Sequence, residues 1–151
     1  MSEPEYWFDA YHTHAAAGVV LLTKDERLVL QLRDDKPDIE NPGMITAFAG
    51  GAEPGETPVD CALRELAEET GIRARGEDIH RLGAISKVSF RGDPTASVFF
   101  LLTGVDPTQL VITEGTMVLL SLEEAVADPR LTEISRVLVE KVRAMNLFSP
   151  K

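Results

Sequence analysis

The sequence contains little of what secreted, membrane-spanning or nucleic-acid-binding chains need. Cys61 is its one cysteine, so it can form no intramolecular disulfide, and a disulfide-stapled secreted scaffold is excluded. The apolar run at residues 15–22 is too short to span a bilayer, and the first five residues are acidic, unlike those of a signal peptide. We therefore expect no membrane anchor and a reducing, cytoplasmic location.

Basic residues are also scarce. Lysine and arginine together number 15 against 25 aspartates and glutamates, which gives a formal net charge of −10. Such a charge repels nucleic acid and anionic lipid, so neither is an expected partner. A polyanionic substrate would need a cation to bind to this surface.

What is present fits one folded domain. The chain has 151 residues, of which 44% are hydrophobic and 26% charged, ordinary values for a globular domain. We predict a single domain over residues 1–151. Residues 1–14 are rich in aromatic side chains and are interpreted as a less ordered arm, or as one that packs on the core or on a partner subunit.

Hydrophobic patterning predicts a mixture of strands and helices. Apolar runs predict strands at residues 15–22, 28–32, 79–90, 96–103 and 117–120. Helical periodicity and capping residues predict helices at 58–70, 121–128 and 132–145. For the last helix the predicted buried stripe consists of Ile134, Val137, Leu138, Val142 and Met145. Prolines exclude regular structure from much of the charged loop at 33–43.

The helix predicted at residues 58–70 has clear start and stop signals. Thr57 is a good N-cap, Pro58 suits the first helical position, and Asp60 stands where a capping-box acid belongs. Gly71 supplies a residue that commonly closes a helix in the left-handed conformation. The glycines before this helix, Gly50 and Gly51, predict an irregular loop whose backbone can approach an ion or a phosphate closely.

Three carboxylates share one side of this helix. At 100° per residue, Glu65, Glu68 and Glu69 fall within an arc of about 100°, and their mutual repulsion would destabilise an isolated helix. A bound cation removes that repulsion. Carboxylate oxygens suit Mg²⁺ or Mn²⁺, and Mg²⁺ commonly completes its shell with substrate phosphates. The pattern predicts a metal-bridged phosphate site, although a solvated acidic face is the ordinary alternative.

Arg64 stands among these acids as the one basic residue of the segment. Its guanidinium can hold a neighbouring glutamate and fix that carboxylate for a metal or a water. Cys61 has no histidine near it in sequence, so we interpret it as a small packing residue of the helix rather than a nucleophile.

The segment from Gly50 to Ile72 resembles the Nudix box, the signature of the MutT-like Nudix hydrolases. That motif reads Gly, five residues, Glu, seven residues, then Arg-Glu-aliphatic-x-Glu-Glu-x-Gly-aliphatic. Its fixed positions are all filled here, by Gly50, Glu56, Arg64, Glu65, Leu66, Glu68, Glu69, Gly71 and Ile72. The resemblance implies an α+β fold, an α/β/α sandwich around a mixed sheet.

The resemblance also implies a reaction, the divalent-metal-dependent hydrolysis of a nucleoside diphosphate linked to another moiety. Glu65, Glu68 and Glu69 would match the metal ligands of the family, with the Gly50 carbonyl nearby. Arg64 and Glu56 would match its orienting and loop-fixing residues. Mg²⁺ is the expected ion, with Mn²⁺ as a substitute, and a homodimer is a common arrangement among relatives.

Two residues outside the box are further candidates. Glu114 precedes the strand at residues 117–120, where several family members carry an extra metal ligand or base; the alternative is a solvated turn. Arg33 follows the strand at 28–32 and is a candidate contact for substrate phosphate or base, as are Gly50 and Gly51 through their backbone. A plain loop arginine is the alternative for Arg33.

A nucleotide-binding regulatory module without turnover is the main alternative function. Such a protein would be expected to have lost box glutamates, and this chain retains them all. An isomerase is less favoured because no cysteine occupies an obvious acid position, and decapping of messenger RNA because no basic stripe is present. The loops at residues 33–43 and 91–94 and the N-terminal aromatic residues are expected to select the substrate.

Overall fold

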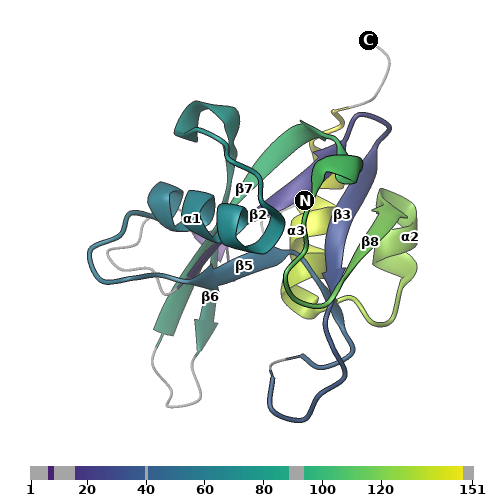
Figure 1. Cartoon of the computed structure of the whole chain (residues 1–151), viewed down its shortest axis with the longest axis horizontal. Coiled ribbons are helices and arrows are strands. Elements are labelled where there is room, and N and C mark those ends of the chain that lie inside the picture. Colours follow the sequence, from purple (N-terminus) through teal and green to yellow (C-terminus); the bar gives the residue numbers. More distant parts are fainter. Residues whose placement is uncertain (1–6, 9–15, 40, 89–93, 148–151) are drawn as a thin grey trace.

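The computed structural model describes residues 7–8, 16–39, 41–88 and 94–147. The described residues form one sheet of eight strands together with three helices, arranged as in Figure 1. The strands are β1 (Trp7–Phe8), β2 (Ala16–Thr23), β3 (Arg27–Leu32), β4 (Ile45–Thr46), β5 (Phe48–Gly51), β6 (His80–Val88), β7 (Pro94–Val105) and β8 (Thr116–Ser121). The helices are α1 (Pro58–Thr70), α2 (Leu122–Ala127) and α3 (Glu133–Ala144), and short 3₁₀ turns cover Gly76–Asp78 and Pro107–Gln109.

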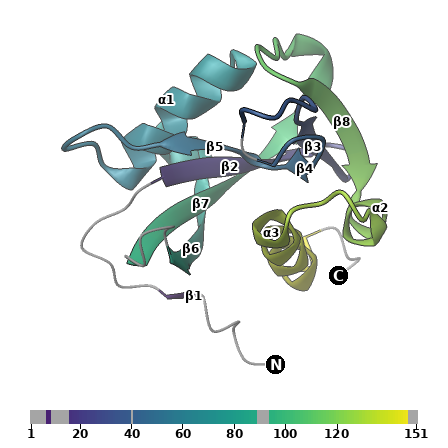
Figure 2. The ribbon, with the colours of Figure 1, turned by 90° about the horizontal axis from the view of Figure 1, so that it is seen from below.

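The sheet is mixed. Its main path runs β1-β6-β7-β2-β3-β4, and β5 and β8 join it by pairing with β2 and β3. The pair β2–β7 is parallel, and the other strand pairs are antiparallel. In Figure 2 α1 lies on one face of the sheet and α2 and α3 lie on the other. The predicted α+β sandwich with a mixed sheet is therefore confirmed.

Strand β2 is buried on both faces. Leu21 packs in the core that contains Leu66 of α1, while the next residue, Leu22, packs in the core that contains Leu138 of α3. These four side chains are at most 1% exposed. Burial of each contributes roughly 1.5–3 kcal/mol of hydrophobic stabilisation. A strand that is covered on both faces is expected to be apolar, and β2 is apolar up to its last residue, Thr23.

The prediction of an irregular loop at Gly50 and Gly51 was wrong. These glycines end strand β5 and pair with Ala17 and Ala16 of β2. The close approach depends on Gly18, because a Cβ on this residue would lie 2.3 Å from the carbonyl oxygen of Phe48. Pairing with an apolar partner strand outweighs the low strand propensity of glycine here.

The predicted stripe of the last helix was wrong at its C-terminal end. Met145 is the C-cap of α3 and 41% exposed, whereas Ser135 and Val139 are buried. Burial of Ser135 is possible because its hydroxyl accepts hydrogen bonds from the Ala47 backbone N–H at 3.0 Å and from the Thr132 hydroxyl at 2.8 Å. These bonds fix α3 to the segment that joins β4 to β5.

The other predicted elements are present within about three residues of their predicted ends, although residues 89–90 of the strand predicted at 79–90 lie outside the described residues. Helix α1 begins and ends as predicted: the Thr57 hydroxyl accepts from the Asp60 N–H at 3.1 Å, and Gly71 has φ of 79°. In the predicted N-terminal arm, the backbone of Trp7–Phe8 pairs with β6, and the rest of residues 1–14 lies outside the described part. No described helix is both long enough and apolar enough to cross a membrane.

Replacing Gly18 by alanine tests the close approach of β2 and β5. The added Cβ would overlap backbone that cannot move freely, so Gly18→Ala should lower the free energy of unfolding by about 2 kcal/mol. Gly76→Ala is the matched control, because a Cβ there meets its nearest atom at 3.4 Å. Urea unfolding measures both variants, and equal stabilities of the two would contradict the close approach.

Candidate functional site

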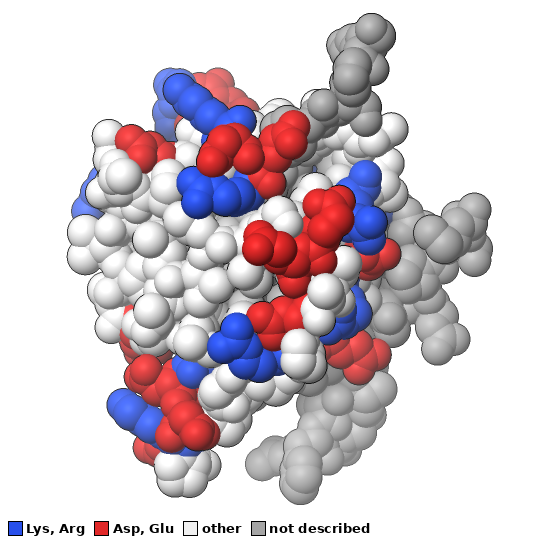
Figure 3. Space-filling model, turned by 90° about the vertical axis from the view of Figure 1, so that its right-hand side faces the viewer, with Lys and Arg blue, Asp and Glu red and all other residues white. Residues whose placement is uncertain are grey.

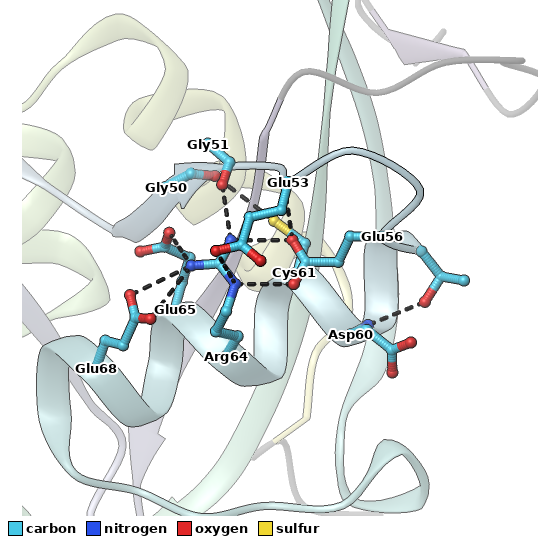
Figure 4. A network of polar contacts seen from close by, with 10 residues as sticks. Gly50, Gly51, Glu53, Glu56, Asp60, Cys61, Arg64, Glu65 and Glu68 are labelled. Atoms are coloured by element: carbon cyan, nitrogen blue, oxygen red, sulfur yellow. Dashed lines mark hydrogen bonds and ion pairs between the residues drawn. The ribbon is translucent and has the colours of Figure 1, made fainter.

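The segment between β5 and α1 folds back towards the helix. The Glu56 backbone N–H donates to the Glu53 carbonyl at 3.0 Å, and the Glu53 N–H donates to Oε1 of Glu56 at the same distance. These two bonds close a tight turn. The Glu56 carboxylate consequently lies over the first turns of α1, where Arg64 reaches it (Figure 4).

Arg64 connects this turn, strand β5 and the acidic flank of α1 (Figure 4). Its Nε and Nη2 donate to the two carboxylate oxygens of Glu56 at 2.8 and 2.9 Å. Nη2 also donates to the Gly51 carbonyl at 2.8 Å, and Nη1 donates to Glu65 at 2.9 Å and to Glu68 at 3.2 Å. A bidentate guanidinium–carboxylate pair is strong and directional. Arg64 therefore fixes the geometry of the whole segment.

The same contacts change the acidity of Glu56. Hydrogen bonds from Arg64 lower the pKa of the Glu56 carboxyl from 4.5 to about 2, and the same bonds raise the pKa of the Arg64 guanidinium above its ordinary value. Glu56 is therefore ionised at every physiological pH. Both oxygens of its carboxylate accept hydrogen bonds from Arg64, so Glu56 is not expected to bind a ligand.

Glu69 has the opposite environment. Burial, followed by the neighbouring Glu65 carboxylate, raises the pKa of Glu69 from 4.5 to about 8; Glu114 acts in the same direction and Arg33 opposes them. Oε1 of Glu69 is buried and has no hydrogen-bond partner. An unpaired buried carboxylate oxygen destabilises the fold, so this position would gain from a cation.

The structure brings Glu114 and Arg33 to the same place from two paired strands. Glu114 precedes β8 and Arg33 follows β3, and both charges act on Glu69. Between them lies Gln31, which is 2% exposed and was missed by the sequence analysis. Its Nε2 donates to the Glu114 carbonyl at 2.8 Å. The sequence did contain a sign of this role, because Gln31 is the one polar residue in the otherwise apolar run at 28–32.

Gly50 lets the Glu65 carboxylate lie against strand β5. A Cβ on Gly50 would be 2.1 Å from Cδ of Glu65, so no other residue fits beside this carboxylate as it stands. The Cys61 thiol lies 3.7 Å from the Gly50 carbonyl oxygen, and burial raises its pKa to about 11. Cys61 is therefore a buried thiol with no thiolate character, in accordance with a packing role.

The acidic flank of α1 suits a hard divalent cation in its donor chemistry. Within the described ranges, no three acidic, histidine or cysteine side chains already converge to enclose an ion, and Arg64 Nη1 contacts both Glu65 and Glu68. The unsatisfied Oε1 of Glu69 and the Glu65 carboxylate, which lies against Gly50, are two features that an oxygen-liganded ion would use. Carboxylate and carbonyl oxygens are the donors that such an ion takes, so the residues present fit it.

A shallow groove adjoins this flank. Its volume is about 520 Å³, within the range of small-molecule sites. It is lined by Leu63, Arg64, Ala67, Glu68, Arg73 and Ala74. A ligand held at Glu68 would therefore have open space beside it along α1.

A family model described as NUDIX domain matches residues 12–142. The chain therefore belongs to the Nudix family of MutT-like hydrolases. The matched range contains α1, the turn before it and both strands that supply Arg33 and Glu114.

Two curated relatives match part of the chain. An uncharacterized Nudix hydrolase, orf19, from Rhodococcus erythropolis is 37% identical over 82 residues, which are 53% of this chain and 44% of that protein. An RNA pyrophosphohydrolase from Erythrobacter litoralis is 38% identical over 63 residues, 42% of this chain and 37% of that protein. The match thus spans less than half the length of either relative.

Solved structures share the fold over most of the chain. The solution structure of the E. coli ORF135 protein has a TM-score of 0.70 at 22% identity. The alignment covers 89% of this chain and 91% of the ORF135 chain. A C. elegans Ap4A hydrolase complex has a TM-score of 0.67 at 20% identity, with coverage of 88% and 97%. The Nudix domain of Shewanella oneidensis NrtR, complexed with ADP ribose, has a TM-score of 0.67 at 18% identity; the alignment covers 89% of this chain and 90% of that one.

Acid unfolding tests the pairing of Glu56 with Arg64. Because the pKa of Glu56 is lower in the fold than its ordinary 4.5, the stabilisation from its ionised form is complete above pH 4.5 and is lost as pH falls towards about 2. Glu56→Gln should therefore be less stable than wild type at pH 6, and the difference should vanish near pH 2. Urea unfolding across this range measures it.

The control is Glu77→Gln, which removes an exposed carboxylate that pairs with the exposed Arg75. Exposed pairs contribute little, so this variant should follow wild type at each pH. A stability difference for Glu56→Gln that stays constant from pH 6 to pH 2 would contradict the pairing.

Proposed function

We propose that the protein hydrolyses a diphosphate bond in a nucleoside diphosphate derivative, with a divalent metal ion as its cofactor. A nucleoside triphosphate, a nucleotide sugar or ADP-ribose is the type of substrate. The observation that carries this proposal is the unsatisfied buried oxygen of Glu69, which lies in the same flank of α1 as Glu65 and Glu68. Like charges three and four residues apart on a helix repel one another, and a bound cation removes that repulsion.

Mg²⁺ is the proposed ion, with Mn²⁺ as a substitute. Glu65, Glu68 and Glu69 would hold it together with the carbonyl of Gly50. When bound, such an ion neutralises the charge of the diphosphate and activates the attacking water. Without it the protein, with a net charge of −10, repels its substrate.

The chain's own residues then have distinct tasks. Arg64 orients Glu65 and ties it to Glu56. Arg33 would contact a substrate phosphate, and the backbone of Gly50 and Gly51 would lie against it. Glu114 is a candidate to accept the proton of the attacking water. A general base in this role must lie within hydrogen-bond distance of that water, or be linked to it by one bridging water.

The relatives support the substrate class in outline. Structural neighbours include an Ap4A hydrolase and a domain complexed with ADP ribose, both of which involve nucleotide diphosphate groups. One curated relative is an RNA pyrophosphohydrolase. On the face shown in Figure 3, Lys and Arg side chains alternate with Asp and Glu among the described residues rather than forming a basic stripe, which favours a small substrate over RNA.

We further propose a cytoplasmic location, from the single free cysteine, and a homodimer that assembles through residues 1–14. A nucleotide-binding regulatory module without turnover remains the alternative function. The two functions differ in one observable result, namely whether a bound nucleotide is hydrolysed.

A substrate panel distinguishes them. With Mg²⁺ and then Mn²⁺ we expect turnover of at least one compound among nucleoside triphosphates including oxidised ones, ADP-ribose, nucleotide sugars, dinucleoside polyphosphates and a 5′-triphosphorylated RNA. Mass spectrometry should identify a nucleoside monophosphate among the products, or, for the RNA, a 5′-monophosphorylated chain together with pyrophosphate. Binding of a panel member with no turnover of any would favour the regulatory module instead.

Two substitutions test the metal ligands. Glu68→Gln and Glu69→Gln keep the side-chain shape and remove a charge, so each should lower kcat roughly a thousandfold. Each should also lose the rise in melting temperature that Mg²⁺ gives wild type, because a ligand that binds only the folded state stabilises it. In EDTA, Glu69→Gln should be at least as stable as wild type, since it relieves repulsion from Glu65.

Glu140→Gln is the matched control, an exposed glutamate on α3 at the opposite face of the sheet. It should keep both wild-type turnover and the Mg²⁺-dependent rise in melting temperature. Wild-type rates in both Glu68→Gln and Glu69→Gln would exclude these residues as ligands.

A further inference from the structure

Gln31 is a buried polar residue whose amide nitrogen and amide oxygen both form hydrogen bonds. It lies in β3 and is 2% exposed. Its Nε2 donates to the Glu114 carbonyl at 2.8 Å, a contact between residues 83 positions apart in the chain, and its Oε1 accepts from Nη1 of Arg33 at 3.4 Å. An amide provides a donor and an acceptor together at the end of the side chain, without a change of protonation state.

The turn that carries Glu114 is docked by two further contacts. Gly115 has φ of +67°, and a Cβ on it would lie 2.4 Å from the carbonyl oxygen of Leu32, so the turn lies directly on the end of β3. On the other side, the Thr113 hydroxyl donates to the Glu68 carbonyl of α1 at 3.3 Å. Glu114 is thus placed between β3 and the acidic flank of α1.

Packing alone does not account for an amide at this position. On the same face of the sheet, Val29 of β3 and Met117, the partner of Gln31 in β8, are apolar, and an apolar side chain would fill the same space without the cost of burying polar atoms. The hydrogen bonds to Glu114 and Arg33 offset that cost. Both of these partners carry charges that act on Glu69, with opposite signs.

Resting on the proposed function, we infer that Gln31 is a positioning residue: its amide holds the Glu114 turn and the Arg33 guanidinium in fixed places beside the carboxylates of α1. Gln31 does not touch the substrate in this role. It acts through Glu114, whose distance from the attacking water it sets, and through Arg33.

A double-mutant cycle tests whether Gln31 acts through Glu114. Gln31→Met keeps the length of the side chain and removes both hydrogen bonds, so it should lower kcat about tenfold on the panel substrate that wild type hydrolyses fastest. In the background of Glu114→Gln the same change should lower kcat only about twofold to threefold, because Glu114 is already disabled and only the effect of Gln31 through Arg33 is left. Equal losses in the two backgrounds would overturn the inference.

Ser135→Ala is the control for general destabilisation. Ser135 is another buried, hydrogen-bonded polar residue, which joins α3 to the segment between β4 and β5. Its loss should lower the melting temperature without coupling to Glu114→Gln. Coupling of the same size for Ser135→Ala and Gln31→Met would reduce Gln31 to a structural role and overturn the inference.

Hydrogen exchange gives a reading that needs neither metal nor substrate. In Gln31→Met, backbone amides of residues 110–116 should exchange about tenfold faster than in wild type, and those of α3 should not. Unchanged exchange at residues 110–116 would overturn the inference. If Gln31→Met does not fold, Gln31→Glu replaces it in both experiments, since it keeps the acceptor for Arg33 and loses the donor to Glu114.

Failure of this inference is distinguishable from failure of the proposed function. If Glu68→Gln abolishes turnover while Gln31→Met retains wild-type kcat, the metal site stands and the role of Gln31 is excluded. If Glu68→Gln retains wild-type turnover, the proposed function itself fails, and faster exchange in Gln31→Met would then show only that the amide docks the turn.

Discussion

Crowding of carboxylates around one guanidinium is the interaction on which the rest of the site depends. Arg64 binds Glu56 with two hydrogen bonds and also reaches Glu65, Glu68 and the backbone of β5. One positive charge cannot compensate this many acids. The shortfall is concentrated at Glu69, whose buried oxygen has no partner and whose pKa is raised to about 8. The fold thus disfavours the ionised form of Glu69, and a divalent cation beside it would stabilise that form.

The sheet makes this arrangement possible by bringing distant segments together. Close packing of β5 on β2, which requires Gly18, places Gly50 where the Glu65 carboxylate lies against the backbone. Pairing of β3 with β8 delivers Arg33 and the Glu114 turn to the opposite side of the same carboxylates. The site is therefore formed by one helix and the ends of several strands. A change in the β2–β5 pairing would displace Gly50, and a change in the β3–β8 pairing would displace Arg33 and Glu114.

Local signals explain what the sequence could predict. The caps Thr57 and Gly71 and the 100° periodicity locate α1 and put its three glutamates on one flank, because these features depend on neighbouring residues alone. The strand character of Gly50 and the buried amide of Gln31 depend instead on partners far along the chain, Ala17 and Glu114. For the same reason Ser135 replaces Met145 on the buried face of α3: its hydrogen-bond partner is Ala47, 88 residues away.

The most direct test of the central claim is the location of a bound ion. An anomalous difference map from crystals grown with Mn²⁺ should show a peak whose ligands include carboxylate oxygens of at least two of Glu65, Glu68 and Glu69, at about 2.0–2.3 Å. Arg64 should then have released Glu68 while it keeps its bidentate bond to Glu56. A fully occupied Mn²⁺ elsewhere on the protein, with these three carboxylates unchanged, would contradict the account.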